Sequence, residues 1–255
     1  MRLIPLGVAG AYTAAGEASP GYLIEEEGKY LLLDAGPGIT GRLAKIVPYY
    51  KLSAIIVSHL HFDHMLDLLP LSYVLYIKHK TVPLYFPRDT ESMFFGTYEA
   101  NEINPFLDAF DIHDTKGEVE IGPFKIKMIP VNHRIATVGT SVETDSGTIA
   151  YTGDTAMCDC LIDLAKNADI FLSEATYQER DRERTKEGHM TAKQAAEVAM
   201  KANVKKLLLT HIWFEYDKRE SLKEAKEIFE NTELAIEMHE YKYNKRIKKI
   251  KNKRI

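Results

Sequence analysis

The sequence predicts an α/β protein in which two sheets carry helices on their outer faces. Three observations support this class. The chain has 255 residues, of which 45% are hydrophobic, and this is enough to bury the core of one large domain. Strands lead at the start of each half of the chain, and helices follow them. The sequence has neither a repeat of solenoid period nor a low-complexity linker, so a single domain is the simplest interpretation.

Short apolar strands separated by turns dominate the first third of the chain, and a Glu-Gly pair marks a hairpin between the second and third strands. A helix near 38–47 precedes the fully apolar strand 54–57. The helical stretch from His64 to about Lys78 is expected to kink at Pro70, because proline lacks the amide N–H that a helix interior needs. The three opening strands are expected at 2–6, 22–26 and 29–34.

Residues 81–118 carry the weakest pattern, and an aromatic group within them at 94–98 fits either a core or a pocket wall. Strands and helices return after this region. A capping-box spacing from Thr191 to Gln194 begins a helix that runs to about Ala202. The other elements expected here are strands 124–131, 141–144, 148–152, 170–173, 206–210 and 234–240, and helices 159–166 and 218–231.

The charge of the chain is unevenly distributed. Lysine and arginine number 33 against 37 aspartates and glutamates, which makes the net charge −4. Eight basic residues and no acid follow Glu240, so the rest of the chain is strongly acidic. An acidic body repels polyanions unless metals reverse its field, whereas a basic tail contacts nucleic acid weakly or simply stays solvated. We therefore expect one domain over 1–241 and a basic tail over 242–255.

The sequence also bears on location. No apolar run reaches the roughly 18 residues that a membrane-spanning helix needs, and the first residues form a strand pattern instead of a signal peptide. We therefore expect a cytoplasmic protein without membrane contact. Cys158 and Cys160 are too close together to staple distant segments. In a reducing cytoplasm we expect them to be buried, inert thiols instead of metal ligands.

The segment from Ser58 to His64 is the most informative part of the sequence. Within six residues that follow a buried strand it places four potential metal ligands, which are His59, His61, Asp63 and His64. Alternate residues of an extended segment point the same way, so His59 and His61 face one side. A turn with Asp63 as the helix N-cap is the structural alternative. Capping needs only one carboxylate, however, and it gives no reason for three adjacent imidazoles.

Three further residues, His133, Asp154 and His211, each follow an expected strand. Sites on layered α/β folds are built where buried strands end. Any one of the three, taken alone, would more often be a structural residue. Together with the first cluster they provide seven nitrogen and oxygen ligands, which is enough for two metal ions that share a carboxylate.

The order of these motifs resembles that of the metallo-β-lactamase superfamily over residues 1 to about 240. The sequence runs His-x-His-x-Asp-His, then a lone His, then Gly-Asp and then a late His, and Asp34 stands at the place of the superfamily's structural aspartate. The resemblance implies an αββα sandwich of four layers with mixed sheets. It also implies that one metal is held by His59, His61 and His133, that the second is held by Asp63, His64 and His211, and that Asp154 bridges them.

Two further motifs resemble the ribonuclease Z and phosphodiesterase branch of that superfamily. Ser173-Glu-Ala-Thr176 is similar to the branch's His-Glu-Ala-Thr motif, and His189-Met-Thr191 is similar to its His-Ser-Thr motif. In that branch the glutamate orients the histidine, which helps to protonate the leaving oxygen. The resemblance implies these roles for Glu174 and His189, although a serine and a methionine replace other polar positions of the motifs.

One feature of the branch is absent from the sequence. True ribonuclease Z enzymes carry a protruding arm that grips tRNA, usually between the lone His and the Gly-Asp motif. Here only residues 134–153 separate His133 from Asp154, and two strands with a hairpin around 145–147 use most of them. The amino-terminal region also lacks the family's phosphate-handling Arg-Asn element. The chain therefore resembles the armless, ribonuclease Z-like hydrolases of bacteria.

The ligand set indicates the chemistry. Imidazole and carboxylate ligands suit zinc first, and manganese, iron and cobalt are also compatible with them. Two divalent ions lower the pKa of a bridging water, so that hydroxide is available near neutral pH. On a phosphodiester that hydroxide would attack phosphorus in line, with Asp63 accepting its proton and His189 protonating the departing alkoxide. We therefore expect catalytic roles for Asp63, His189 and Glu174.

These inferences predict a dinuclear metal phosphodiesterase that acts on a small or single-stranded nucleotide substrate. A hydrolase of esters, thioesters or lactones with the same fold is the first alternative, because better leaving groups do not need an acid such as His189. A non-catalytic RNA-binding protein that uses the basic tail is the second alternative, and the complete ligand set argues against it. The expected partners are a small-molecule or nucleotide substrate and a weak nucleic-acid contact through the tail, and a homodimer stays open.

Overall fold

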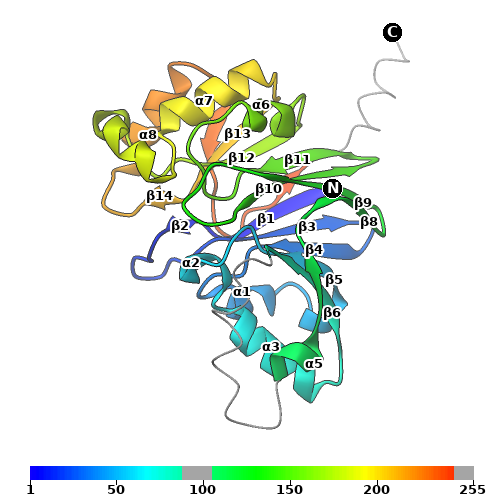
Figure 1. Cartoon of the computed structure of the whole chain (residues 1–255). Coiled ribbons are helices and arrows are strands. Elements are labelled where there is room, and N and C mark those ends of the chain that lie inside the picture. The colour runs from blue at the N-terminus through cyan, green and yellow to red at the C-terminus, as the bar shows by residue number, and fades with distance from the viewer. Residues whose placement is uncertain (88–104, 244–255) are drawn as a thin grey trace.

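Two mixed sheets pack face to face in the computed structural model, which describes residues 1–87 and 105–243. Helices cover the outer face of each sheet, so the layers follow the order helix, sheet, sheet, helix (Figure 1). The apolar side chains accordingly form three buried layers, one between the sheets and one under each set of helices. This arrangement confirms the predicted αββα sandwich with mixed sheets.

The first sheet has the strand order β16-β1-β3-β4-β5-β6-β7. β1 pairs antiparallel with β16 and β3, and β3 forms an antiparallel hairpin with β4. From β4 to β7 the neighbouring strands are parallel, so the chain must cross over the outer face between them. The strands are β1 (Arg2–Gly7), β3 (Gly21–Glu26), β4 (Lys29–Leu33), β5 (Leu52–Ile56), β6 (Val82–Phe86), β7 (Phe110–Asp114) and β16 (Tyr241–Lys242).

The second sheet has the strand order β15-β13-β12-β11-β10-β9-β8. β8 to β11 form an antiparallel meander, and β11, β12, β13 and β15 are parallel neighbours. The strands are β8 (Gly117–Ile121), β9 (Phe124–Pro130), β10 (Val138–Thr144), β11 (Gly147–Tyr151), β12 (Ile170–Glu174), β13 (Leu207–Thr210) and β15 (Thr232–Leu234).

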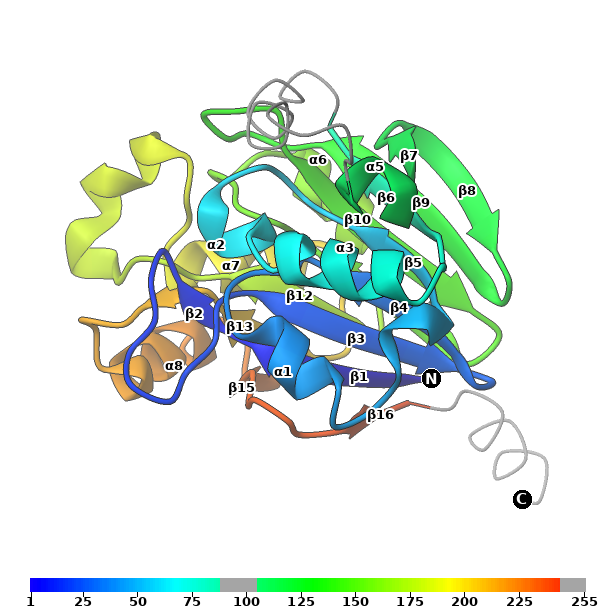
Figure 2. The ribbon, with the colours of Figure 1, turned by 90° about the horizontal axis from the view of Figure 1, so that it is seen from below.

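The helices divide between the two outer faces. α1, α3 and α5 pack on the first sheet, and Figure 2 shows α1 and α3 lying across that face. α6, α7 and α8 pack on the second sheet. The helices are α1 (Ile39–Leu43), α2 (Phe62–Met65), α3 (Leu68–Ile77), α5 (Pro105–Ala109), α6 (Cys160–Ala165), α7 (Ala192–Lys201) and α8 (Lys218–Lys226), with 3₁₀ segments η1 (Tyr49–Lys51) and η3 (Glu179–Glu187).

The central strands of the sandwich are buried on both faces. Leu31 and Leu33 of β4 point between the sheets, whereas Leu32 points toward the helices. Successive side chains of a strand face opposite sides, so a strand covered on both sides contains an apolar run. This is why runs such as 54–57 predict core strands correctly.

A short parallel ladder between β2 (Ala9–Gly10) and β14 (Ile212–Trp213) joins the amino-terminal loop to the segment after β13. Gly10 is required at this crossing, since a Cβ atom there would lie 2.5 Å from the carbonyl oxygen of His211. The ladder thereby holds two segments some two hundred positions apart side by side, next to the predicted ligand His211.

The helix that follows the histidine cluster is interrupted, but before Pro70 and not at it. α2 ends at Met65 and α3 begins at Leu68, so Pro70 falls in the first turn of α3. The amide groups of a first helical turn have no partner within the helix, and the missing N–H of proline therefore costs nothing there. The expectation of a kink at Pro70 was wrong for this reason.

Two other regions differ from the sequence prediction. Residues 81–118 contain β6, β7 and the start of β8, three strands that were not predicted from the sequence. The aromatic group at 94–98 lies outside the described residues. The helix expected at 218–231 ends at Lys226, and the strand expected at 234–240 is replaced by β15 and β16 with a turn between them. The capping box is confirmed, because the Thr191 side chain accepts from the Gln194 N–H and the Gln194 side chain accepts from the Thr191 N–H.

The carboxyl-terminal strand closes the first sheet. Tyr241 pairs with Leu3, and Lys242 pairs with Arg2, so Lys242 belongs to the sheet. The N–H of Tyr243 donates to the carbonyl oxygen of Met1 at 3.0 Å. The rest of the predicted basic tail lies outside the described residues. Among the described helices, none combines the length and the apolar character needed to cross a membrane.

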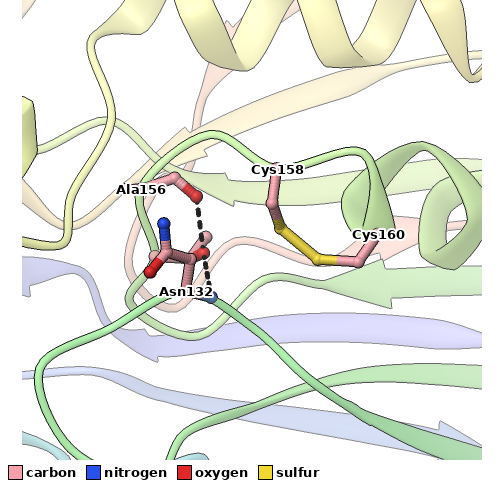
Figure 3. The surroundings of a disulfide bond; sticks show 5 residues. Asn132, Ala156, Cys158 and Cys160 are labelled. Atoms are coloured by element: carbon pink, nitrogen blue, oxygen red, sulfur yellow. Dashed lines mark hydrogen bonds between the residues drawn. A yellow bond between two sulfur atoms is a disulfide. The ribbon is translucent and has the colours of Figure 1, made fainter.

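Cys158 and Cys160 form a disulfide bond (Figure 3), so the expectation of free thiols was wrong. Their Cα atoms are 5.3 Å apart, a distance that a disulfide spans, because the chain turns here into α6. Residue spacing alone does not show how a turn directs two side chains. The N–H of Ala156, in the same loop, donates to the carbonyl oxygen of Asn132 at 2.7 Å (Figure 3), which ties this loop to the segment that carries His133.

Candidate metal centre

The seven predicted ligands gather at one place, where β5, β9, β11 and β13 end. Their ligand atoms form two groups in which all atoms lie within 4.8 Å of one another. The first group contains His59, His61, His133 and Asp154, and the second contains Asp63, His64 and His211. The structure thus brings together every residue of the predicted ligand set, and the role of these residues as metal ligands stays a prediction.

In the first group, three imidazole nitrogens converge. His59 Nε2 lies 3.0 Å from His61 Nδ1, and His133 Nε2 lies 3.2 Å from the same nitrogen. His59 sits in the extended segment after β5 and is fully buried, whereas His61 and His133 are partly exposed. Ring nitrogens at such distances from one another are typical of ligands that surround a common cation.

In the second group, two imidazoles converge with a carboxylate. His64 Nε2 lies 3.3 Å from His211 Nε2, and Asp63 Oδ2 lies 3.2 Å from His211 Nε2 and 3.5 Å from His64 Nε2. His64 comes from α2, whereas His211 follows β13 with a positive φ of 54° that turns its ring toward the site. The N–H of Ala11 donates to Asp63 Oδ2 at 3.1 Å, which holds the carboxylate in place.

Asp154 lies between the two groups. Its Oδ2 is 3.6 Å from His59 Nε2, and its Oδ1 is 3.3 Å from His64 Nε2 and 3.5 Å from His211 Nε2. Oδ1 is buried and makes no hydrogen bond with any group of the described residues. A buried carboxylate oxygen without a hydrogen-bond partner is costly, so the site fits a cation at this position. The two oxygens face different groups, as a bridging carboxylate requires.

Hydroxyl groups set the tautomers of two of the histidines. Thr176 Oγ1 donates its single proton to Glu174 Oε2 at 2.7 Å, so it must accept from His211 Nδ1, 2.9 Å away. Ser58 Oγ donates to Asp34 Oδ2 and must accept from His59 Nδ1, 3.0 Å away. In the neutral tautomer that these contacts select, Nε2 of both imidazoles is the free nitrogen and is directed at the ligand groups, which is the form that binds a metal.

Backbone and carboxylate acceptors do the same for two more histidines. His133 Nδ1 lies 2.8 Å from the carbonyl oxygen of Gly188, and His64 Nδ1 lies 2.8 Å from Asp34 Oδ2. Neither oxygen can donate, so each Nδ1 carries a proton and Nε2 is the nitrogen left to bind a metal. A set of imidazole nitrogens and carboxylate oxygens with these supporting contacts suits zinc, and manganese, iron and cobalt are also compatible.

His189 and Glu174 form a buried pair beside the ligands. Glu174 Oε1 accepts from His189 Nδ1 at 3.0 Å and from the Thr155 N–H at 2.9 Å, and Oε2 accepts from the Met190 N–H at 3.2 Å. Burial lowers the pKa of His189, but the Glu174 carboxylate outweighs it and raises that pKa to about 9. His189 also forms a third group of possible ligands with Asp154 and His211, whose ligand atoms lie within 4.8 Å of one another. The structure therefore brings this predicted catalytic pair next to the two ligand groups at the ends of the strands.

The sequence profile described as "Beta-lactamase superfamily domain" matches residues 29–212, well over half of the chain. The chain belongs to this superfamily. It is 31% identical over 244 residues to the "Probable metallo-hydrolase YhfI" of Bacillus subtilis, covering 92% of this chain and 96% of the relative. The crystal structure of YhfI superposes with a TM-score of 0.84 at 28% identity, covering 94% of this chain and 99% of that structure.

Two further relatives of this superfamily member are described as nucleases. The ribonuclease Z of Ignicoccus hospitalis is 27% identical over 289 residues, covering 93% of this chain and 96% of the relative. The crystal structure of the short form of human tRNase Z superposes with a TM-score of 0.79 at 22% identity, covering 95% of this chain and 99% of that structure. At that identity the second likeness concerns the fold alone.

Electrostatics favour neutral imidazoles in the first group of this superfamily member. Burial lowers the pKa of His59, His61 and His133, and neighbouring imidazoles lower it further. Desolvation disfavours the charged form of a histidine, so these three rings are neutral near pH 7. A neutral imidazole is ready to bind a metal ion without first losing a proton.

The second group holds more negative charge. Burial alone would lower the pKa of His64, but Asp154, Asp63 and Asp34 outweigh it and raise that pKa well above its usual value. Burial opposes ionisation of Asp154, but His211 and His64 hold its pKa well below the usual range. These carboxylates therefore favour a second proton on His64, at Nε2, and a cation that binds there competes with that proton.

Several supporting residues were not singled out from the sequence. Thr176 lies inside the Ser173–Thr176 motif, and Ser58 directly precedes His59. Their closeness to these motifs is the one sequence feature that could have indicated a supporting role. Tyr151, whose hydroxyl donates to Asp34 Oδ2 at 2.6 Å, had no such signal. The sequence does not show whether a serine, threonine or tyrosine hydroxyl stays in solvent or orients a histidine ring or its supporting carboxylate.

We expect Asp34→Asn to lower metal affinity by roughly 10- to 100-fold, the usual effect of losing a group that orients a ligand. The buried carboxylate accepts from the Ser58 N–H at 2.7 Å as well as from His64 and Tyr151, and an amide would set its own N–H groups against donors. Chelator competition measures the affinity. As a matched control, Asp67→Asn alters a carboxylate that accepts from the Thr40 N–H at 2.7 Å and should leave metal affinity unchanged. Wild-type affinity in Asp34→Asn would contradict the prediction.

Proposed function

We propose that this protein is a metal-dependent phosphodiesterase that acts on a small or single-stranded nucleotide through two divalent ions, zinc being the best fit. The coarser assignment is a metallo-hydrolase of the β-lactamase superfamily, because relatives that cover over nine-tenths of the chain are described as a probable metallo-hydrolase and as ribonuclease Z. The observation that carries the finer proposal is the His189–Glu174 pair, with 3.0 Å between Nδ1 and Oε1, beside the two ligand groups. An acid held there serves a leaving group that departs poorly without a proton.

Bound metal ions would supply a nucleophile near neutral pH and neutralise the charge of the phosphate. The residues of the chain then handle the protons. Asp63 Oδ2, a member of the second group held by the Ala11 N–H, accepts the proton of the attacking water in this proposal. His189 carries the proton that passes to the departing oxygen, so the P–O bond breaks to give an alcohol and a phosphate monoester. Glu174 accepts from Nδ1 of His189, which leaves Nε2 as the donor.

A substrate panel with and without chelator tests this proposal. Bis-p-nitrophenyl phosphate, a thioester and a lactone represent the phosphodiesterase and the alternative hydrolases. We expect turnover of the phosphodiester that chelator abolishes and zinc or manganese restores. Turnover of the thioester or lactone alone would overturn the phosphodiesterase in favour of the alternative, and no metal-dependent turnover would overturn both.

We expect pre-tRNA 3′ processing by this protein to be weak or absent. Between His133 and Asp154 the structure holds β10 and β11 with a tight turn, which leaves no arm at that position to grip tRNA. The alignment with the Ignicoccus ribonuclease Z spans 289 positions, more than the 255 residues of this chain, so part of that relative has no counterpart here. A cleavage assay on a full pre-tRNA at low enzyme concentration measures this.

Efficient cleavage in that assay would overturn the expectation, and deletion of residues 244–255 would then show whether the basic tail grips the RNA. The deletion starts at 244 because Lys242 pairs in the first sheet and Tyr243 bonds to Met1. Contact of the tail with nucleic acid, a cytoplasmic location and a homodimer stay predictions.

A further inference from the structure

We propose that Tyr12 and Phe214 form an aromatic platform on which the base of the nucleotide substrate stacks, next to the second ligand group. This inference rests on the proposed function, because it names the part of the substrate that lies outside the metal site. It assigns substrate recognition to a loop that none of the catalytic motifs includes.

The platform lies beside the second group because the backbone on both sides of it is tied to ligands. Ala11, which precedes Tyr12, donates its N–H to Asp63 Oδ2 at 3.1 Å. Phe214 stands three residues after His211. The β2–β14 ladder pairs Gly10 with Trp213 and so joins the two segments. Figure 1 shows β2, from which the Tyr12 loop leaves, next to β14.

The Tyr12 ring is held firmly but left open to solvent. Its hydroxyl accepts from Trp213 Nε1 at 3.2 Å and donates to Glu215 Oε1 at 3.1 Å, and its ring meets that of Phe214 edge to face with 4.6 Å between centroids. Even so, 45% of Tyr12 and 37% of Phe214 are exposed. An ordered aromatic pair that stays exposed has already lost its conformational freedom, so a planar ligand can stack on it at little further entropic cost.

A third aromatic residue and a carboxylate indicate which part of the substrate binds here. Phe62 lies between the predicted ligands His61 and Asp63 and is 65% exposed, the largest exposure among the exposed large hydrophobic residues described. The Glu215 carboxylate, bonded to Tyr12, repels anionic groups from this rim. The phosphate therefore binds at the ligand groups, and the uncharged base stacks on the rings. Stacking on aromatic side chains accepts any base, since every base has a π face.

Two chromogenic esters with the same leaving group test the platform. Thymidine 5′-(p-nitrophenyl phosphate) carries a base, and methyl p-nitrophenyl phosphate carries none. The ratio of their kcat/KM values measures what the base contributes. We expect Tyr12→Ala and Phe214→Ala to lower this ratio by about 10-fold, within the range that a stacked base contributes. Tyr12→Phe keeps the ring and should retain most of the ratio.

Tyr50→Ala is the matched control, because Tyr50 is 47% exposed on η1, away from the ligand loops. It should leave the ratio at the wild-type value. An unchanged ratio in Tyr12→Ala would overturn the platform, and so would an equal loss with Tyr50→Ala. If turnover of a thioester or lactone depends on Tyr12 and turnover of the nucleotide ester does not, the rings bind an acyl group and not a base.

A binding measurement separates failure of the platform from failure of the phosphodiesterase. The chain contains one tryptophan, Trp213, and its indole N–H bonds to Tyr12. Thymidine 5′-monophosphate that stacks on the platform should therefore change the intrinsic fluorescence, and Tyr12→Ala should weaken that binding about 10-fold. If neither ester is hydrolysed, this titration still decides the inference. If the esters are hydrolysed and the nucleotide leaves the fluorescence unchanged up to millimolar concentration, the platform is wrong and the phosphodiesterase stands.

Discussion

Asp154→Ala is expected to abolish the binding of at least one metal ion per chain and to lower kcat by about 10³-fold or more. The reason is the position of this carboxylate, whose two oxygens face different ligand groups. Oδ2 lies 3.6 Å from His59 Nε2, and Oδ1 lies 3.3 Å from His64 Nε2 without a hydrogen bond from the described residues. Its removal leaves both groups without a shared anion, and several buried imidazoles then face one another without compensation.

Elemental analysis of protein purified without chelator measures this, together with steady-state rates on the phosphodiester of the panel. We expect the wild-type protein to hold two metal equivalents per chain. Asp163→Ala, which alters an exposed aspartate on α6, should keep the metal content and the rate. Well under one equivalent in the wild-type protein, with no gain in activity from added zinc or manganese, would overturn the dinuclear site.

His189→Ala is expected to lower kcat on a poorly activated phosphodiester by roughly 10²- to 10⁴-fold, which is what a general acid contributes. An alkoxide leaves slowly unless it is protonated, and we propose that His189, which Glu174 holds beside the site, is the acid. A nitrophenolate leaves without a proton, so the loss on a nitrophenyl ester should be much smaller. The comparison of the two leaving groups therefore reports the chemical role and not the general integrity of the site.

Metal content is the second measurement on His189→Ala. We expect it to equal that of the wild-type protein, although the possible ligand atoms of His189, Asp154 and His211 also lie within 4.8 Å of one another. Loss of metal, or an equal loss of rate on both leaving groups, would show that His189 is not the leaving-group acid and would favour the ester or thioester hydrolase.

Glu174→Gln should show a similar but smaller leaving-group dependence, because this residue orients the imidazole without touching the substrate. Glutamine is preferred to alanine here. The buried side chain accepts from the N–H groups of Thr155 and Met190 through different oxygens. Glutamine keeps the size of the side chain and one acceptor oxygen, whereas alanine would leave both donors unsatisfied. If kcat on the nitrophenyl ester and kcat on the poorly activated phosphodiester fall equally in this variant, Glu174 has a purely structural role.

The elements that the sequence predicts well are those whose cause is local. The capping box at Thr191 forms because both partners lie within one turn, and the apolar run of β5 becomes a core strand because both of its faces are covered. β6 was missed because Pro83 lies within it and argues against a strand, and β7 was missed although Phe110 and Ile112 alternate with polar residues. The Cys158–Cys160 disulfide was missed because it depends on the direction of a turn.

The sequence by itself determined which residue types stand at the ends of the strands, and the order of these motifs identified the superfamily. The tertiary structure alone decided how they are used. It set both oxygens of Asp154 toward different groups, directed the proton of Thr176 to Glu174 so that His211 offers Nε2, and brought Tyr12 beside Phe214. The physical reason is that periodicity and capping act within a few residues, whereas these contacts join segments up to about two hundred residues apart and exist only once the order of the strands is established.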